Sequence, residues 1–127
     1  MYKPEQIAQI IVMDWGRSRG DIEPFIFHFA NERSCSPKEG QILKRMGVRR
    51  GVSDFFLCCP RGGFSGLWIE LKVGDNKPTP EQYDFIHLMT SQGYLAMWRT
   101  GATPQEAAEV VKKEILDYLA LNESLKQ

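Results

Sequence analysis

The chain has 127 residues, of which 43% are hydrophobic and 25% charged, and its formal net charge is zero. This length predicts a single domain over residues 1–127, and the composition is that of a globular chain rather than a disordered or fibrous one. No apolar run approaches the roughly 20 residues of a membrane-spanning helix, and a neutral chain gives no overall argument for nucleic-acid binding.

The N-terminal stretch MYKPEQIAQIIVMDW is not typical of a secretory signal peptide, because its short apolar run is interrupted by Gln9 and Asp14. The cysteines, Cys35, Cys58 and Cys59, form neither a disulfide framework nor a zinc-ligand pattern. We therefore expect free thiols and an intracellular, cytoplasmic protein.

The first half of the chain predicts two helices and two short strands. Pro4 suits the first turn of a helix, and Gly16 ends the apolar periodicity that follows it. Ser36 followed by Pro37 is typical of a second helix start. The expected elements are a helix over residues 4–15, an aromatic strand (FIFHFA) over 25–30, a helix over 37–46 and a strand over 54–59.

The second half begins with a turn, PRGG, which predicts a hairpin between strand 54–59 and the next strand. Thr79-Pro80 and Thr103-Pro104 each read as a helix cap followed by a first-turn proline. The expected elements are a strand over 66–73, a helix over 80–92, a strand over 94–99 and a helix over 104–121. This order predicts an α/β (α+β) fold, with a four-stranded mixed sheet flanked by helices.

The strand GLWIELKV carries two charged residues, Glu70 and Lys72, that are two positions apart and therefore share one face. One interpretation is a half-buried strand with a solvated face and a small ion pair. The other is that both charges point into a working site. The aliphatic residues on the opposite face are Leu67, Ile69, Leu71 and Val73.

Asp54 opens the neighbouring strand of the predicted hairpin, so its side chain can come within about 5 Å of a facing residue. Two carboxylates at that distance repel each other unless a cation neutralises them. Oxygen ligands on a rigid sheet, with positions left for water and phosphate, suit Mg²⁺ or Mn²⁺. Lys72 beside such a metal could orient a water or offset charge on a phosphate. The spacing alone does not decide between a nuclease site and an ion-paired strand.

Basic residues are concentrated around Asp54. Arg49 and Arg50 flank the approach to it and are the first candidates for contacts with DNA phosphates. Weaker candidates are Lys44, Arg45 and Lys77. Most basic clusters are only solvated faces, so charge alone leaves both interpretations open.

Several motifs stand in a fixed order along the chain: GVRRGVSD, a Gly-Gly turn, GLWIELK, TPEQ and GY. Upstream are Glu5 and Gln9 on the first helix and Asn31 after the FIFHF strand. This series resembles the virus-type replication-repair nuclease (VRR-NUC) domain of the PD-(D/E)XK nuclease superfamily. The resemblance extends from about Glu5 to the last helix.

The resemblance implies that Asp54 and Glu70 bind the divalent metal, with the backbone carbonyl of Leu71 as a third ligand, and that Lys72 is the catalytic lysine. Ser53 stands where the superfamily name has proline, a position that shapes the turn. The acids and the lysine are intact, which indicates an active copy.

Other residues keep two interpretations. The resemblance places Gln82 in the site, holding a water or the scissile phosphate, but Gln82 also fits a capping box. Glu5 is either an outer-shell metal ligand or an acid favourable at a helix start. Trp68 is either a wall of the site or core packing, and we expect His28 to be packed rather than a general base.

The resemblance implies a Mg²⁺-dependent DNA endonuclease, with Mn²⁺ as a substitute, that leaves a 5′-phosphate and a 3′-hydroxyl. It further implies branched DNA such as a Holliday junction as substrate, a homodimer, and a role in phage replication, repair or recombination. The last helix or the FIFHF strand could supply the dimer interface. The alternatives are a catalytically idle DNA-binding or recruitment module on a nuclease scaffold, and a plain interaction domain.

Overall fold

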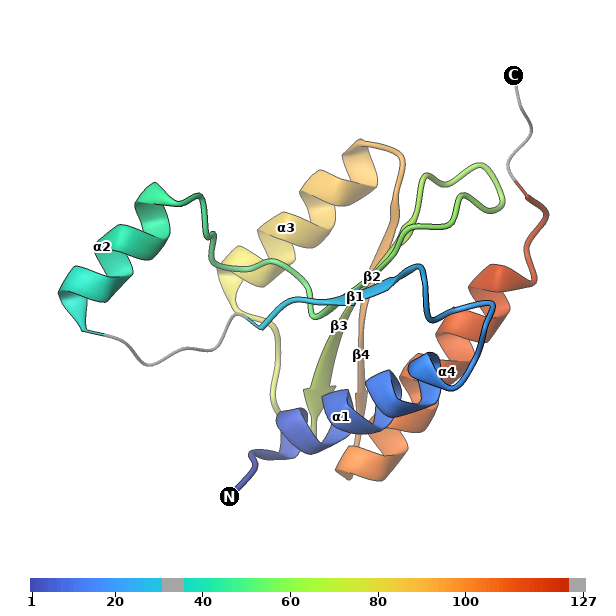
Figure 1. The fold of residues 1–127 in the computed structure, drawn as a ribbon, viewed down its shortest axis with the longest axis horizontal. Helices are drawn as coiled ribbons and strands as arrows, with labels where there is room; N and C mark the ends of the chain where they lie inside the picture. Colours follow the sequence, from blue (N-terminus) through green and yellow to red (C-terminus); the bar gives the residue numbers. More distant parts are fainter. Residues whose placement is uncertain (31–35, 124–127) are drawn as a thin grey trace.

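The computed structural model describes residues 1–30 and 36–123, and within them one sheet is flanked by helices (Figure 1). The expected Asn31 element and Cys35 lie outside the described residues. The order of helices and strands is the one that the sequence predicts. The elements are α1 (Pro4–Arg17), β1 (Ile26–His28), α2 (Pro37–Arg45), β2 (Phe55–Leu57), β3 (Leu67–Val73), α3 (Pro80–Ser91), β4 (Leu95–Gly101) and α4 (Pro104–Leu119).

The sheet is mixed, with the strand order β1-β2-β3-β4. Strand β2 is antiparallel to both β1 and β3, which confirms the predicted hairpin, and β4 is parallel to β3. A parallel pair needs a crossover connection, and α3 provides it between β3 and β4. The α+β class and the four-stranded mixed sheet are therefore confirmed.

One face of the sheet is the hydrophobic core. The alternate residues of β3 point to this face and are almost completely buried. Helices α1 and α4 pack against each other and against the sheet there, as Figure 1 shows. Burial of aliphatic side chains between these layers is the main stabilising contribution to the fold. The core includes Ala8, Val12, Leu67, Ile69, Leu71, Val111 and Ile115.

The other face carries the polar residues of β3 and is partly covered by α3. Helix α3 packs mainly on β4 and β3. Phe85 meets the Trp68 ring edge-on at a centroid distance of 4.9 Å, and Tyr83 meets Trp98 in the same way. The helix therefore lies over the half of this face that belongs to β3 and β4.

Strand β3 is longer than its neighbour β2, which leaves part of its edge without a partner strand. Strands β1 and β2 have three residues each and β3 has seven. The ladder between β2 and β3 ends at the pair Phe55–Ile69. Residues 70–73 of β3 therefore extend past β2, and their backbone groups on that edge need partners other than a strand.

The boundaries of the elements differ from expectation by up to two residues at each end, and at two of them the contacts give the reason. Helix α1 does not end at Gly16 but continues to Arg17. Gly16 is buried within the helix, and the following turn packs directly on it through Ile22 and Ile26, which a Cβ there would touch at ordinary contact distance. Strand β1 begins at Ile26, because the Phe25 N–H donates to the Ile22 carbonyl in the preceding turn.

Helix α2 stands away from the sheet (Figure 1) and buries none of its residues. Its start is the predicted capping box, in which the Ser36 hydroxyl accepts from the Glu39 N–H. Ile42 and Met46 on and after it are 50% and 72% exposed. Among the described residues, no helix is long and apolar enough to cross a membrane.

Candidate active site

Asp54 and Glu70 face each other across the hairpin. Continuing the β2–β3 register by one residue beyond Phe55–Ile69 pairs Asp54 with Glu70. Opposite residues of an antiparallel pair point to the same face and lie about 4.5–5.5 Å apart at Cα. Both residues are buried, with 8% and 2% of their surface exposed. The expectation that the hairpin brings the two carboxylates together is met.

The Asp54 carboxylate is held from two sides. Its Oδ2 accepts from the backbone N–H of Leu71 at 2.7 Å, and its Oδ1 accepts from Gln9 Nε2 at 3.1 Å. The aspartate thus takes the place of a strand at the exposed edge of β3. In an extended strand the N–H and C=O of one residue leave the same edge. The Leu71 carbonyl therefore lies on the edge that Asp54 occupies, where a third ligand would be needed.

Glu70 is an acid that its surroundings keep protonated. Burial, and then the charge of Asp54, raise its pKa to about 8, although Lys72 acts in the opposite direction. Its Oε1 is buried and has no hydrogen-bond partner among the described residues. A buried polar atom without a partner is costly in a folded protein and is often explained by an ion or water.

Lys72 completes the group. Its Nζ lies 3.4 Å from Glu70 Oε2, and only 7% of the residue is exposed. The interpretation of Glu70 and Lys72 as a solvated surface pair is therefore wrong. A lysine is almost never this buried unless it is paired, and here the partner is a carboxylate that itself prefers to be neutral.

The donor set fits a hard, hydrated cation. In the described part of the chain, no cluster of three or more His, Cys, Asp or Glu side chains is placed to hold a metal. Mg²⁺ commonly uses one or two protein carboxylates and fills its remaining positions with water and phosphate oxygens. Asp54, Glu70 and the Leu71 carbonyl form such an incomplete set, and a cation there would relieve the repulsion between the acids.

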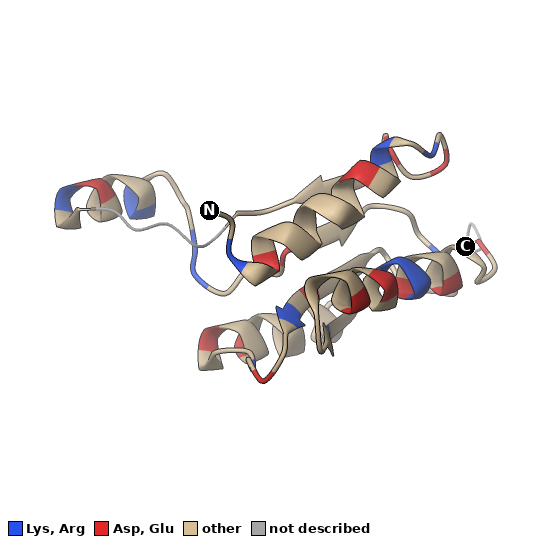
Figure 2. Ribbon diagram, turned by 90° about the horizontal axis from the view of Figure 1, so that it is seen from below, with Lys and Arg blue, Asp and Glu red and all other residues tan. Residues whose placement is uncertain are grey.

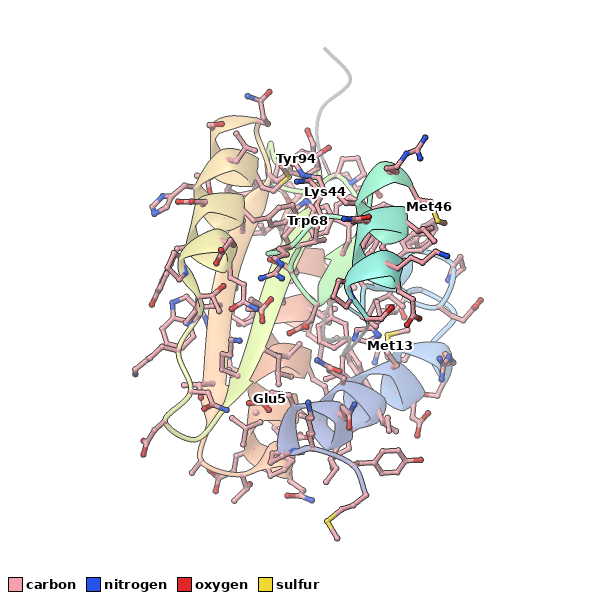
Figure 3. The ribbon with its side chains drawn as sticks, turned by 90° about the vertical axis from the view of Figure 1, so that its left-hand side faces the viewer. Glu5, Met13, Lys44, Met46, Trp68 and Tyr94 are labelled. Atoms are coloured by element: carbon pink, nitrogen blue, oxygen red, sulfur yellow. The ribbon has the colours of Figure 1, made fainter. Side chains whose placement is uncertain are left out.

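Glu5 lies farther along the same edge of β3. Its Oε2 accepts from the Val73 N–H at 3.2 Å and from Asn76 Nδ2 at 2.6 Å. Figure 3 shows Glu5 at the start of α1, beside the sheet. Glu5 is thus more than a favourable acid at a helix start, because it satisfies the backbone where β3 ends.

Gln82 occupies the capping box of α3. Its Oε1 accepts from the Thr79 N–H at 2.8 Å, and its own N–H donates to the Thr79 hydroxyl. The helix start is nevertheless close to the approach to Asp54. Gly51 has a φ of +87°, and a Cβ on it would lie 2.5 Å from the Glu81 carbonyl oxygen. Only glycine fits there, so the GVSD loop is pressed against the end of α3 that carries Gln82.

The predicted phosphate contacts lie outside this buried group. Arg49, Arg50 and Lys44 are exposed on α2 and the loop after it. In Figure 2, basic residues stand at both ends of α2, the helix that lies apart from the others. Lys77 is exposed, and its Nζ lies 5.5 Å from the centre of the Trp98 ring. These positions can reach a long polyanion without entering the carboxylate pair.

Trp68 belongs to an aromatic cluster beside Glu70. It stacks on Phe56 at a centroid distance of 4.3 Å and also contacts Phe29, Phe85 and Tyr94. Its indole Nε1 is buried and lacks a hydrogen-bond partner within the described ranges. Trp68 therefore packs as expected while standing on the site face of β3.

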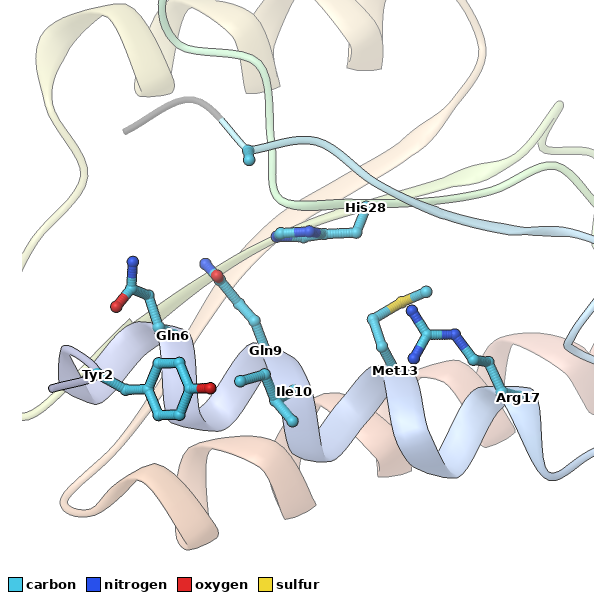
Figure 4. A pocket seen from close by; sticks show the side chains of 8 residues that line it. Tyr2, Gln6, Gln9, Ile10, Met13, Arg17 and His28 are labelled. Carbon is cyan, nitrogen blue, oxygen red and sulfur yellow. The ribbon is translucent and has the colours of Figure 1, made fainter. Parts of the chain in front are cut away.

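A hollow of about 290 Å³ lies between α1 and β1 (Figure 4). His28 borders it, packs on Phe55 and has its pKa lowered by burial, so its imidazole is neutral at physiological pH. Gln9 lines the hollow and also bonds Asp54. The lining residues are Tyr2, Gln6, Gln9, Ile10, Met13, Arg17, His28 and Ala30.

The sequence did not predict that Gln9 bonds the Asp54 carboxylate. Gln9 holds Asp54 from a helix 45 positions earlier in the chain. The one available indication was its place in the first helix, one turn after Glu5 on the same face.

Comparisons with known proteins bear on this arrangement. No known family model matches the chain, and no curated protein matches it. A solved structure described as a VRR_NUC domain protein superposes with a TM-score of 0.72 and 27% sequence identity. The match covers 97% of this chain and 93% of that one. Fold, ordered motifs and this similarity together support a VRR-NUC domain with a PD-(D/E)XK-type nuclease fold.

Proposed function

We propose that the protein is a Mg²⁺-dependent DNA endonuclease that hydrolyses phosphodiester bonds. The observation that carries this proposal is the buried pair of carboxylates, Asp54 and Glu70, with Lys72 Nζ 3.4 Å from Glu70. A structural ion pair needs one acid and one base. Two acids and one lysine at a sheet edge are instead suited to a divalent cation and a phosphate.

Asp54, Glu70 and the Leu71 carbonyl would hold the cation, with Mn²⁺ as a substitute for Mg²⁺. When bound, the cation supplies a more acidic water for attack and neutralises charge on the phosphate. Gln9 and the Leu71 N–H fix the Asp54 carboxylate in advance, so little reorganisation is needed when the substrate arrives.

The ammonium group of Lys72 acts on the substrate side. With Glu70 engaged by a cation, the Lys72 Nζ, which lies 3.4 Å from Glu70 Oε2, would be free to donate to a phosphate oxygen. In that position it offsets the negative charge that develops as the bond to the 3′-oxygen breaks. The products are a 5′-phosphate and a 3′-hydroxyl.

Branched DNA, such as a Holliday junction, is the proposed substrate, in phage replication, repair or recombination. A domain of 127 residues has little surface for reading sequence. Exposed cations at Arg49, Arg50 and Lys44 suit phosphate contacts, which read the shape of DNA rather than its bases.

The protein is proposed to act as a homodimer, because two sites related by a two-fold axis can cut two strands of a junction symmetrically. Light scattering at micromolar concentration tests this directly. The expected mass is twice the 14.6 kDa of the chain. A monomeric mass would contradict paired cutting by a preformed dimer.

A panel of labelled substrates tests the proposed activity. It comprises a four-way junction, a 5′ flap, a splayed arm, a linear duplex and a single strand, each with Mg²⁺, Mn²⁺ or EDTA. The expected result is cutting of branched DNA with either metal and none in EDTA. Tight binding to a branched substrate without any cutting would instead support an idle DNA-binding module.

A further inference from the structure

Two exposed phenylalanines stand on the edge strand of the sheet, in line with the candidate active site. Phe27 pairs with Phe56 on β2, and Phe56 pairs with Trp68 on β3. Directly paired residues share a face. Phe27, Phe56 and Trp68 therefore form one row across three strands, on the face that carries Glu70.

The next row contains the catalytic carboxylates. The Phe29 N–H donates to the Asp54 carbonyl at 2.8 Å, which continues the β1–β2 ladder one step beyond His28. Asp54 is in turn opposite Glu70 in the register of β2 and β3. Phe29 thus occupies the same cross-strand row as both acids, and its ring lies 5.7 Å from that of Trp68.

The outer members of these rows are open to solvent. Phe27 is 48% exposed and Phe29 is 38% exposed, while Phe56 and Trp68 beside them are half-buried. Helix α3 covers mainly the β3 and β4 half of this face. An edge strand with bare aromatic rings is a liability for aggregation unless something is meant to lie on it.

We propose that Phe27 and Phe29, backed by Phe56 and Trp68, stack unpaired bases of branched DNA beside the scissile phosphate. These four residues are called the aromatic platform. The inference rests on the proposed nuclease function and names the feature of the substrate that the site selects. Aromatic rings stack on bases without regard to sequence, whereas bases inside a duplex are already stacked on each other.

The charged residues near the aromatic platform favour DNA, rather than an apolar protein surface, as the partner that binds it. The platform is bordered at the row of Asp54 by a cation-binding acid pair, and the chain leading into Asp54 carries exposed Arg49 and Arg50. A nucleic-acid strand has an anionic backbone for the arginines and the metal site and apolar base faces for the rings. A hydrophobic protein surface would match only the rings.

The consequence is selectivity for branch points. A strand that leaves the duplex at a junction or flap can place its first unpaired bases on Phe29 and Phe27 while its backbone crosses the acid pair. A fully paired duplex cannot do so without unstacking. The protein then prefers branched DNA even though the carboxylate site itself would accept any phosphodiester.

Binding measured in EDTA tests the platform separately from catalysis. Anisotropy gives the dissociation constants for a splayed-arm DNA and for a fully paired duplex of the same sequence. Fluorescence of 2-aminopurine at the first unpaired base reports stacking. The variant F27L/F29L removes the exposed rings, F27Y/F29Y keeps them, and Y2L is a control that removes an exposed ring elsewhere. Tyr2 is 67% exposed and lines the hollow beside His28, whose side chain points to the opposite face of β1.

The platform predicts that F27L/F29L weakens splayed-arm binding by about tenfold or more and relieves 2-aminopurine quenching. Duplex binding should change less than twofold, and F27Y/F29Y and Y2L should behave as wild type. Equal losses on both DNAs, no loss at all, or conversion of a dimer to a monomer by F27L/F29L would overturn the proposal. If stacking is found in a protein that cuts nothing, the nuclease function fails and the platform stands.

Discussion

At the scale of single residues, the unusual group is Glu70, because its surroundings favour the protonated form of the carboxyl group. Its pKa is raised to about 8 from an ordinary value of 4.5, mainly by burial. The folded protein therefore binds this proton more strongly than the unfolded chain does. Without metal, the free energy of unfolding should fall as pH rises from about 4.5 to about 8, and level off above that range.

Glu70→Gln isolates this effect, because glutamine has the same shape and no charge. In EDTA we expect the variant to be at least as stable as wild type at pH 8, and to lose the decline of stability with pH. Added Mg²⁺ should stabilise wild type, more so at high pH, and leave the variant unchanged. Denaturant unfolding at several pH values measures this. The difference in free energy of unfolding, wild type minus Glu70→Gln, cancels the opposite contribution of His28; a difference that rises over this pH range would contradict the assignment.

Gln9 is a positioning residue for Asp54, and its removal should act through the metal. Gln9→Ala deletes the donor to Asp54 Oδ1. Loss of such a supporting contact typically costs about 10–100-fold in metal affinity or activity. The cleavage rate should fall about tenfold, and more Mg²⁺ should be needed for half-maximal rate. Gln105→Ala, an exposed site on α4, is the control. Equal rates for the two variants would remove Gln9 from the site.

At the scale of elements, the open edge of β3 explains the ligand arrangement. Asp54 and Glu5 supply oxygens to the N–H groups of Leu71 and Val73, where β2 has ended. Glu5→Ala should lower the free energy of unfolding by about 1–3 kcal/mol, because a backbone donor loses its acceptor. Glu5→Gln keeps an acceptor oxygen and should cost much less in urea unfolding.

The same pair of variants separates the two interpretations of Glu5. If Glu5 only closes the strand end, Glu5→Gln should leave the Mg²⁺ dependence of cleavage unchanged. A glutamine variant that folds as stably as wild type and needs several-fold more Mg²⁺ would show that the charge acts as an outer-shell ligand.

Helix α2 and the loop after it form an element for electrostatic contact. Their exposed cations include Lys44, Arg49 and Arg50. The triple alanine variant should bind DNA more weakly, and its slope of log K against log salt should be shallower by about 0.9 per lost phosphate contact. K112A/K113A on α4 is the control. Identical slopes for wild type and the triple variant would exclude α2 from the DNA interface.

Most of the helices and strands could be predicted from the sequence, because each is indicated by a short pattern of neighbouring residues. Alternation in GLWIELKV, the PRGG turn and the Thr-Pro caps each predict their own structure, and the hairpin register then brings Asp54 opposite Glu70. Long-range contacts could not be predicted. No short sequence pattern indicates that the Gln9 side chain bonds Asp54, or that Phe29 continues the β1–β2 ladder past His28.

Gln82 shows a second limit of prediction from the sequence. The sequence TPEQ supports both a capping box and a site residue, and the two interpretations assign different contacts to the same side chain. The structure gives the capping contact to Gln82 Oε1. Its role toward a water or phosphate stays a prediction.

At the scale of the whole molecule, the hydrophobic core and the candidate active site lie on different faces of the sheet. Helices α1 and α4 cover the apolar face, and α3 covers part of the other. The carboxylate pair, Lys72 and the aromatic platform all lie on or at the edge of the second face. On that face the proposed metal site, the exposed cations and the aromatic platform would meet one DNA strand.

The central claim is that Asp54, Glu70 and Lys72 form a metal-dependent nuclease site. The most direct measurement is the cleavage rate of one labelled four-way junction by wild type, Lys72→Ala and the surface control Lys113→Ala, with Mg²⁺ and with EDTA. We predict Mg²⁺-dependent cutting by wild type and Lys113→Ala, and a rate at least about a hundredfold lower for Lys72→Ala. Cutting by a folded Lys72→Ala protein at the wild-type rate would contradict the account.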